Sequence, residues 1–414
     1  MDTGIMARTV SDAGRKAVCL ENASVRTVIC AQGGMMPEFG LKRGRGLLNA
    51  HWIPQWRANS GLPWSPAEHK AFWKSGLLYH LAGDFPCSPS FGGDCVVEGV
   101  ALPAHGWAAS SEWKLERVGV EDGVAFARFT LVSPDARMPL EYVKDDLVFP
   151  GQDAYFSVMT IRNTGAKPIL INVGRHNTIG GPFLQAGCRI SLPADRFLTA
   201  PHGTEFEATG QLRLGAEFTD LAHAPLADGG TVDLSKVPGP IGYTDLVTGA
   251  IPRELALGWS AVANPETGLA YVCFFPGMEG LPEGEIALGF NDLWLQYGGR
   301  PFTPWAMAEG APDRTFCLGT ENITGAYAEG LAYSLGHREL LGRETLVEIP
   351  AGGERTLCYG AALLDIGAGL AVEGIRKVEA APGRIVLSGV RTSCQFQVGS
   401  DFGEARRFVR HLGR

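Results

Sequence analysis

The chain has 414 residues, of which 45% are hydrophobic and 19% are charged, and its formal net charge is −8 with a pI near 5.7. This composition excludes an intrinsically disordered chain and leaves room for one large all-β domain or two ordinary domains. The acidic balance, together with the lack of a long Lys/Arg run, argues against a nucleic-acid partner.

The chain carries no membrane signal in its sequence. Residues 1–16 lack the apolar stretch and cleavage pattern of a secretion signal, and no window approaches the ~20 apolar residues of a membrane span. We therefore expect a soluble, cytoplasmic protein with no membrane partner.

Nine cysteines are scattered along the chain. They form no C-x-x-C pair and no Cys/His cluster with zinc spacing, so no metal site is predicted. A chain of this size needs no disulfide staples, and in a reducing compartment we expect free, mostly buried thiols. Cys87 and Cys95 are close in sequence, and a disulfide between them is the disfavoured alternative.

The first predicted strand covers residues 25–29, ahead of Gly33 and Gly34. Residues 38–80 differ from the rest because they hold four of the nine Trp, while Pro and Gly interrupt any period. We expect a long ordered loop here, an aromatic insertion with one helix that begins at Ser65 and Pro66. This insertion either closes one end of the fold or forms an aromatic wall against a sugar.

Short apolar runs separated by turn residues continue through the rest of the chain, which has 55 Gly and 26 Pro in total. This pattern predicts an all-β fold, a large antiparallel β-sandwich with a few short helices, rather than a parallel α/β sheet. We expect one domain over residues 1–414, with a C-terminal extension at 370–414 made of an edge hairpin and an amphipathic helix at 403–412. The predicted strands lie at 124–132, 140–172 (broken at two turns), 286–290, 293–297, 315–319, 344–349 and 355–363.

Three polar residues stand in apolar, strand-like surroundings. They are His105 in Leu-Pro-Ala-His-Gly-Trp, His176 in Gly-Arg-His-Asn-Thr and Glu321 in Leu-Gly-Thr-Glu-Asn. Two imidazoles and one carboxylate can move protons on and off sugar oxygens near neutral pH. Each residue alone has a structural alternative: a rim carboxylate, a histidine bonded to a carbonyl, and a histidine that caps a turn.

Four stretches, in order and spacing, resemble the aldose 1-epimerase or galactose mutarotase-like family. The resemblance covers about residues 17–365, and it implies a large antiparallel β-sandwich with the site on its concave face. The stretches are an opening strand pair at 20–34, Phe85-Pro86-Cys87 to Gly92 with Pro103-Ala104-His105-Gly106, the strands and turns from 150 to His176, and Leu293-Trp294 with Gly319-Thr320-Glu321.

The resemblance also implies roles in mutarotation, the opening of a pyranose ring and its closure on the other face of C1. Glu321 is then the base that removes the proton of the anomeric hydroxyl. His176 is the acid at the ring oxygen, and His105 bonds a substrate oxygen. The reaction needs no metal and no organic cofactor.

Further residues are candidates for binding the sugar. Turn capping is the structural alternative for Asp245 and Asp292, and core packing is the alternative for Trp107. If residues 293–297 form a strand, Trp294 and Gln296 share one of its faces. The candidates are His80, Asp84, Trp107, Asp245, Asp292, Trp294 and Gln296.

The sequence departs from the family at its arginines. Residues 79–84, directly before Phe85, contain no Arg, and Trp107-Ala108-Ala109 stands where the sugar-phosphate branch has an Arg. A phosphate needs Arg or Lys partners, so a free or lightly modified sugar is favoured, unless Arg57, Lys74 or Arg175 substitutes. A non-catalytic sugar-binding module and another sugar isomerase or lyase stay open as alternatives, as do a monomer and a homodimer.

Overall fold

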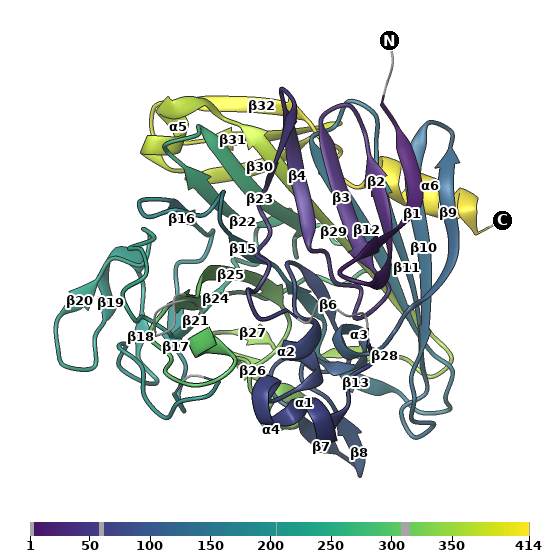
Figure 1. The fold of residues 1–414 in the computed structure, drawn as a ribbon, viewed down its shortest axis with the longest axis horizontal. Coiled ribbons are helices and arrows are strands. Elements are labelled where there is room, and N and C mark those ends of the chain that lie inside the picture. The colour runs from purple at the N-terminus through teal and green to yellow at the C-terminus, as the bar shows by residue number, and fades with distance from the viewer. Residues whose placement is uncertain (1–3, 58–61, 204, 308–314, 414) are drawn as a thin grey trace.

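The computed structural model describes residues 4–57, 62–203, 205–307 and 315–413, which fold into layered antiparallel sheets (Figure 1). The predicted all-β class is confirmed. The N-terminal sheet packs beside a long back sheet, and the site sheet faces the back sheet across the main core. The N-terminal sheet contains β1 (Met6–Asp12), β2 (Arg15–Glu21), β3 (Val25–Cys30), β4 (Glu38–Arg43) and β5 (Gly46–Asn49).

The back sheet has eight strands, and its middle strands are buried on both faces. β22 and β23 are buried at every position, rather than at alternate positions, because each face of the sheet is covered by a separate core. In spatial order the strands are β16 (Arg189–Ser191), β22 (Leu257–Asn264), β23 (Leu269–Pro276), β29 (Glu354–Asp365), β12 (Ala154–Asn163), β11 (Leu140–Val148), β10 (Val124–Val132) and β9 (Lys114–Glu121).

The site sheet is shorter and carries the residues of the candidate site. It continues from β25 to β14 and β6, so three distant parts of the chain meet there. Its strands are β18 (Glu217–Phe218), β17 (Phe197–Thr199), β21 (Leu246–Ala250), β24 (Phe290–Tyr297), β25 (Phe316–Ile323), β14 (Gly174–His176) and β6 (Phe85–Cys87), with β15 (Thr178–Gly180) also paired to β25.

Helices and short hairpins fill the ends of the sheets. The helices are α1 (Pro66–Trp73), α2 (Gly76–His80), α3 (Gly106–Ser110), α4 (Gly330–Gly336), α5 (Gly367–Glu373) and α6 (Gly403–Leu412), with 3-10 turns η1 (Leu221–His223) and η2 (Trp305–Met307). The paired short strands are β7 (Cys95–Val97) with β8 (Val100–Leu102), β13 (Ile169–Ile171) with β28 (Val347–Ile349), β19 (Ala224–Pro225) with β20 (Thr231–Val232), and β26 (Glu339–Leu340) with β27 (Arg343–Glu344).

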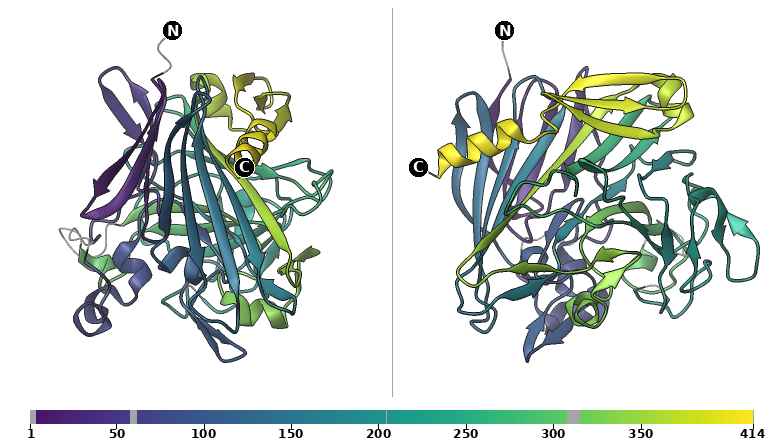
Figure 2. Two further views of the ribbon diagram at one scale, coloured as in Figure 1. Left: turned by 90° about the vertical axis from the view of Figure 1, so that its right-hand side faces the viewer. Right: turned by 180° about the vertical axis from the view of Figure 1, so that it is seen from behind.

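The C-terminal segment covers the outer face of the back sheet. It forms a three-stranded sheet of β30 (Lys377–Ala381), β31 (Arg384–Ser388) and β32 (Ser393–Gln397), followed by α6 across the strands (Figure 2). Phe408 packs edge-on against Phe126 of β10, within a second apolar core. The prediction of the helix at 403–412 is confirmed, and the hairpin has a third strand.

Two local predictions are wrong. Residues 38–49 are not a loop, because β4 pairs with both β3 and β5, and the following segment holds two helices rather than one. Residues 286–289 lie outside the strands, and β24 begins only at Phe290. In both places the partner strand, rather than the local pattern, decided where pairing occurs.

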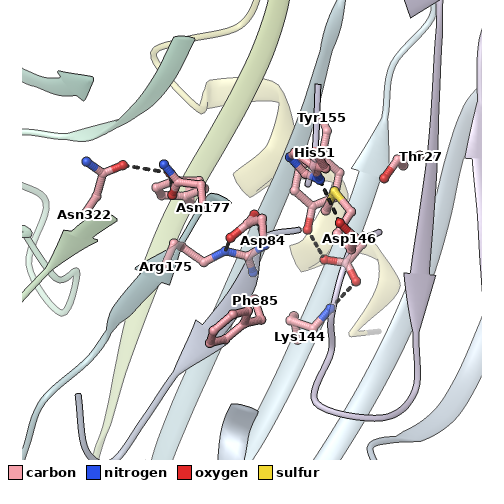
Figure 3. A network of polar contacts seen from close by, with 12 residues as sticks. Thr27, His51, Asp84, Phe85, Lys144, Asp146, Tyr155, Arg175, Asn177 and Asn322 are labelled. Carbon is pink, nitrogen blue, oxygen red and sulfur yellow. Dashed lines mark hydrogen bonds and ion pairs between the residues drawn. The ribbon is translucent and has the colours of Figure 1, made fainter. Parts of the chain in front are cut away.

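A buried polar layer lies between the site sheet and the back sheet (Figure 3). The Arg175 guanidinium pairs with the Asp84 carboxylate, with Nε 3.1 Å from Oδ1, and Lys144 pairs with Asp146. Tyr155 donates to the same Asp146 carboxylate at 2.5 Å. Buried charges are tolerated only when they are paired and hydrogen-bonded, and these are.

All nine cysteines are free, and all except Cys95 and Cys394 are buried, as the sequence predicts. None of the helices in residues 4–57, 62–203, 205–307 and 315–413 combines the length and apolar character that crossing a bilayer requires.

Candidate functional site

Two neighbouring strands of the site sheet bring His176 and Glu321 together. Arg175 of β14 pairs with Asn322 of β25, so the next residue on β14 comes beside the preceding residue on β25. The His176 Nε2 atom lies 3.0 Å from Glu321 Oε1, and both side chains are almost fully buried, at 4% and 2% exposure. The sequence separates these residues widely, and the strand pairing joins them.

Successive side chains of a strand point to opposite faces, so the residues next to His176 and Glu321 in the chain point toward the inner polar layer. Arg175 bonds Asp84 there, while Asn177 Nδ2 donates to Thr320 Oγ1 at 2.8 Å. The Tyr359 hydroxyl of the back sheet lies 2.7 Å from the side-chain oxygens of both Asn177 and Asn322. Residues on both sides of His176 and Glu321 are therefore anchored, which fixes the two strands that carry the pair.

The His176 ring is held from three sides. Its Nδ1 atom lies 3.1 Å from Thr178 Oγ1, and the Phe85 ring stacks on it at 4.6 Å with an interplanar angle of 17°. The edge of Trp294 approaches at 5.4 Å. Burial by itself lowers the pKa of His176, but the Glu321 carboxylate outweighs it, so the pKa is raised above its ordinary value. The structure thus favours an imidazolium at this position.

His105 differs from His176 in its charge state, because its surroundings favour the neutral ring. It precedes α3 with φ of 56°, and its Nδ1 accepts the Gly92 amide proton at 3.3 Å. Because Nδ1 is an acceptor, the ring proton of neutral His105 lies on Nε2. Burial and the nearby His176 lower its pKa well below the ordinary value, and the two rings meet at 5.0 Å. His105 is therefore a neutral hydrogen-bond donor.

A pocket of about 570 Å³ opens in front of the two histidines. His105 and His176 line it, and Glu321 adjoins it through its contact with His176. Such a volume suits a ligand the size of a sugar. The other walls come from α2 and its preceding turn, the loops at 92–94 and 200–206, Trp294, and residues 328–329.

Of the seven predicted sugar-binding side chains, Trp294 lines this pocket. Asp292 is buried in the row of residues beneath it, next to Glu321. Gln296 is also buried, and it follows Trp294 on β24.

The remaining four candidates have structural partners elsewhere. Asp84 belongs to the inner polar layer with Arg175, and His80 Nδ1 accepts from Arg15 Nε at 3.2 Å. Trp107 packs in the main core. Asp245 accepts the backbone N–H groups of residues 211 and 212, both at 3.1 Å, and so holds a loop. Trp107 and Asp245 thus have the packing and loop-holding roles that the sequence left open as alternatives.

Glu205 is a pocket residue that the sequence did not reveal. Its Oε2 accepts the Trp294 indole proton at 2.7 Å and lies 3.7 Å from Arg300 Nη1. The Glu205 side chain is 25% exposed, and its partial removal from water raises its pKa, while Arg300 and the indole oppose that shift. Glu205 and the neighbouring Phe206 sit on an irregular loop, where no periodicity marks a functional side chain.

The cations considered for a phosphate have different positions. Arg57 pairs with Asp12 at 2.6 Å and Arg175 with Asp84, so both are committed away from the pocket. Lys74 lines the pocket and is exposed. Three acidic residues share the pocket wall with it, namely Asp94, Glu205 and Glu329.

No family model and no curated protein sequence matches this chain. Its structure, however, is similar to solved structures. A protein described as a candidate aldose 1-epimerase from Klebsiella pneumoniae superimposes with a TM-score of 0.63 at 14% identity, with 90% of this chain and 91% of the other covered. A galactose mutarotase-like protein from Clostridium acetobutylicum gives 0.55 at 10% identity, covering 87% and 99%. The protein has the galactose mutarotase-like fold.

The Slr1438 protein from Synechocystis shares this mutarotase-like fold, with a TM-score of 0.54 at 14% identity over 87% of this chain and 96% of its own. Identities this low establish the fold, while function depends on the site. Within the described part of this mutarotase-like chain, no group of three or more His, Cys, Asp or Glu side chains is arranged to hold a metal ion.

Proposed function

We propose that this protein is a carbohydrate epimerase of the aldose 1-epimerase type, which interconverts the anomers of a small sugar. The observation that carries the proposal is the buried His176–Glu321 pair, 3.0 Å apart, in which His176 lines a pocket large enough for a sugar. A hydrogen-bonded acid and base in a water-poor site are the groups that ring opening requires.

The chemistry is compatible with an acid and a base that lie close together, because they act on two oxygens bonded to the same carbon. In a pyranose, the anomeric hydroxyl oxygen and the ring oxygen are both bonded to C1. Glu321 takes the proton of the anomeric hydroxyl while His176 gives its proton to the ring oxygen. The C1–O5 bond then breaks and leaves an aldehyde at C1. The substrate oxygens replace the direct contact between His176 and Glu321 in this step.

Closure reverses both proton transfers after rotation about the C1–C2 bond. The C5 hydroxyl returns its proton to His176 as its oxygen attacks the other face of C1. Glu321 returns its proton to the aldehyde oxygen, so the enzyme regains its starting protonation state. Each positioned group typically contributes ~10²–10⁴-fold to the rate. Neutral His105 donates a hydrogen bond to a substrate oxygen throughout.

The pocket favours an uncharged sugar. Trp294 and Phe206 offer aromatic surface for the apolar face of a pyranose. Asp94, Glu205 and Glu329 accept from sugar hydroxyls, and they outnumber the exposed Lys74. A phosphate or a sugar acid requires cationic partners, so these substrates, and with them a lyase acting on oxidised sugars, are disfavoured.

The test is NMR exchange spectroscopy of α/β anomers across a panel of neutral sugars. We expect faster exchange for at least one sugar, and loss of that exchange in Glu321→Gln. Exposed Glu348→Gln on β28 is the matched control, and thermal unfolding verifies that both variants fold. Saturable sugar binding without faster exchange would overturn the proposal in favour of a non-catalytic sugar-binding module.

A further inference from the structure

Asp292 stands beside Glu321 on the adjacent strand β24. The register pairs Thr248 with Asp292 and Asp292 with Glu321, so the three side chains form one row on one face of the site sheet. Directly paired residues have Cβ atoms about 4.5–5.5 Å apart. His176 continues the row on the other side of Glu321. Two carboxyl groups are thus neighbours within this row, and one of them contacts the pocket residue His176.

Asp292 has none of the partners that an ionised carboxylate needs. Its exposure is 0%, and neither of its carboxyl oxygens accepts a hydrogen bond of normal geometry from the described residues. The described chain also gives it no ion pair. The Thr248 hydroxyl is its neutral neighbour on β21. A buried, unpaired carboxylate is strongly destabilising, so the neutral acid is the stable form.

The neighbouring charges point the same way. Glu321 faces Asp292 from β25, Tyr327 approaches from the loop after β25, and the His176 imidazolium lies beyond Glu321 and is committed to it. Burial raises the pKa of Asp292 well above its ordinary range, the Glu321 carboxylate raises it further, and the Thr248 hydroxyl opposes the shift without reversing it. Two adjacent buried carboxyls hold one proton more readily than two negative charges.

We propose that Asp292 remains protonated and donates its O–H to a carboxylate oxygen of Glu321, so that the two carboxyl groups hold one proton between them. Asp292 is then a positioning residue for the base, and this inference rests on the proposed function of Glu321. His176 bonds one side of the Glu321 carboxylate and Asp292 the other. The carboxylate stays ionised and its plane is fixed before the sugar arrives.

Two substitutions separate a neutral donor from a negative charge at position 292. Asp292→Asn keeps the shape and an N–H donor without an ionisable group, whereas Asp292→Leu removes the donor. Because wild-type Asp292 is neutral, we expect Asp292→Asn to leave the acid limb of the pH profile of kcat/KM in place. We expect Asp292→Leu to lower kcat by about tenfold or more and to move the acid limb to higher pH, because the Glu321 carboxylate loses a hydrogen bond.

Two measurements need no catalysis and so distinguish this inference from the proposed function. Infrared difference spectra should show a protonated carboxylic acid in the wild type at neutral pH that is absent in Asp292→Asn and present in Glu321→Gln. NMR titration should show the same His176 pKa in the wild type and in Asp292→Asn. A wild type without the acid band, or a His176 pKa that falls in Asp292→Asn, would mean that Asp292 is ionised and would overturn the inference.

Discussion

The carboxylate of Glu321 lies over Gly319, two residues earlier on β25. A Cβ atom at position 319 would lie 2.8 Å from Glu321 Oε1 and 2.8 Å from the Trp294 Cβ. Both contacts are too close, so the glycine leaves the space that the carboxylate occupies. The position of the proposed base therefore depends on a missing side chain.

We predict that Gly319→Ala displaces Glu321 and slows anomer exchange by ~10²-fold, since a shift of about 1 Å in a catalytic group has an effect of this size. Exchange spectroscopy on the substrate found for the wild type measures it. The control is Gly369→Ala in α5, where an added Cβ meets nothing within 4 Å. Equal rates for Gly319→Ala and the control would contradict the prediction.

The free energy of unfolding should depend on pH through His176. Glu321 raises the folded-state pKa of His176 despite its burial, whereas the unfolded value is about 6.5. The stabilisation is fully present below pH ~6.5 and is lost as the pH rises through the raised value. Urea unfolding across this range, compared between wild type and His176→Asn, measures the difference. Parallel profiles for the two proteins would exclude the predicted contribution.

His105 should give the opposite dependence. Its folded-state pKa is well below the ordinary value because the ring is buried beside His176, so the unfolded chain takes up the proton first. The stability that neutral His105 contributes is present above pH ~6.5 and falls as the pH drops below it. Acid unfolding of His105→Asn should therefore be less steep below pH ~6.5 than that of the wild type. A steeper profile would show that His105 is charged in the fold.

Removing one partner of the Arg175–Asp84 ion pair should strongly lower the free energy of unfolding. The two side chains are 2% and 0% exposed, so Arg175→Met leaves a buried, uncompensated carboxylate. We expect a loss of about 3–5 kcal/mol in the free energy of unfolding, measured by urea denaturation. The double variant Arg175→Met with Asp84→Leu should recover much of this loss. A double variant as unstable as the sum of both single ones would contradict the pairing argument.

Glu205 should affect substrate binding more than chemistry. Glu205→Gln keeps an acceptor for the Trp294 indole but removes the negative charge at the pocket wall. We expect a KM for a neutral sugar that rises several-fold, with kcat nearly unchanged, because the lost interaction is the same in ground and transition states. Glu217→Gln, exposed and paired with Arg196, is the control. A drop in kcat alone would instead place Glu205 in the chemical step.

Local sequence patterns determined much of the fold. The apolar run at 124–132 became β10, and the amphipathic segment at 403–412 became α6. Hydrophobic periodicity and helix capping involve only a few neighbouring residues, so they can be recognised in the sequence without knowledge of the fold. The same patterns failed at 38–49, where β3 recruits β4 as a partner.

The sequence also determined which residue types were available for the site. His105, His176 and Glu321 stood out because polar groups are rare in apolar strands, and the first two line one pocket. Their catalytic roles stay predictions until exchange is measured.

Tertiary structure alone decided which side chains face that pocket. Strand pairing sends alternate residues to opposite faces, so Asp84 joins the inner polar layer whereas Asp292 comes to lie against Glu321. Glu205 reaches Trp294 from an irregular loop that carries no pattern. Such contacts join residues far apart in the chain, and only the folded arrangement of the sheets specifies them.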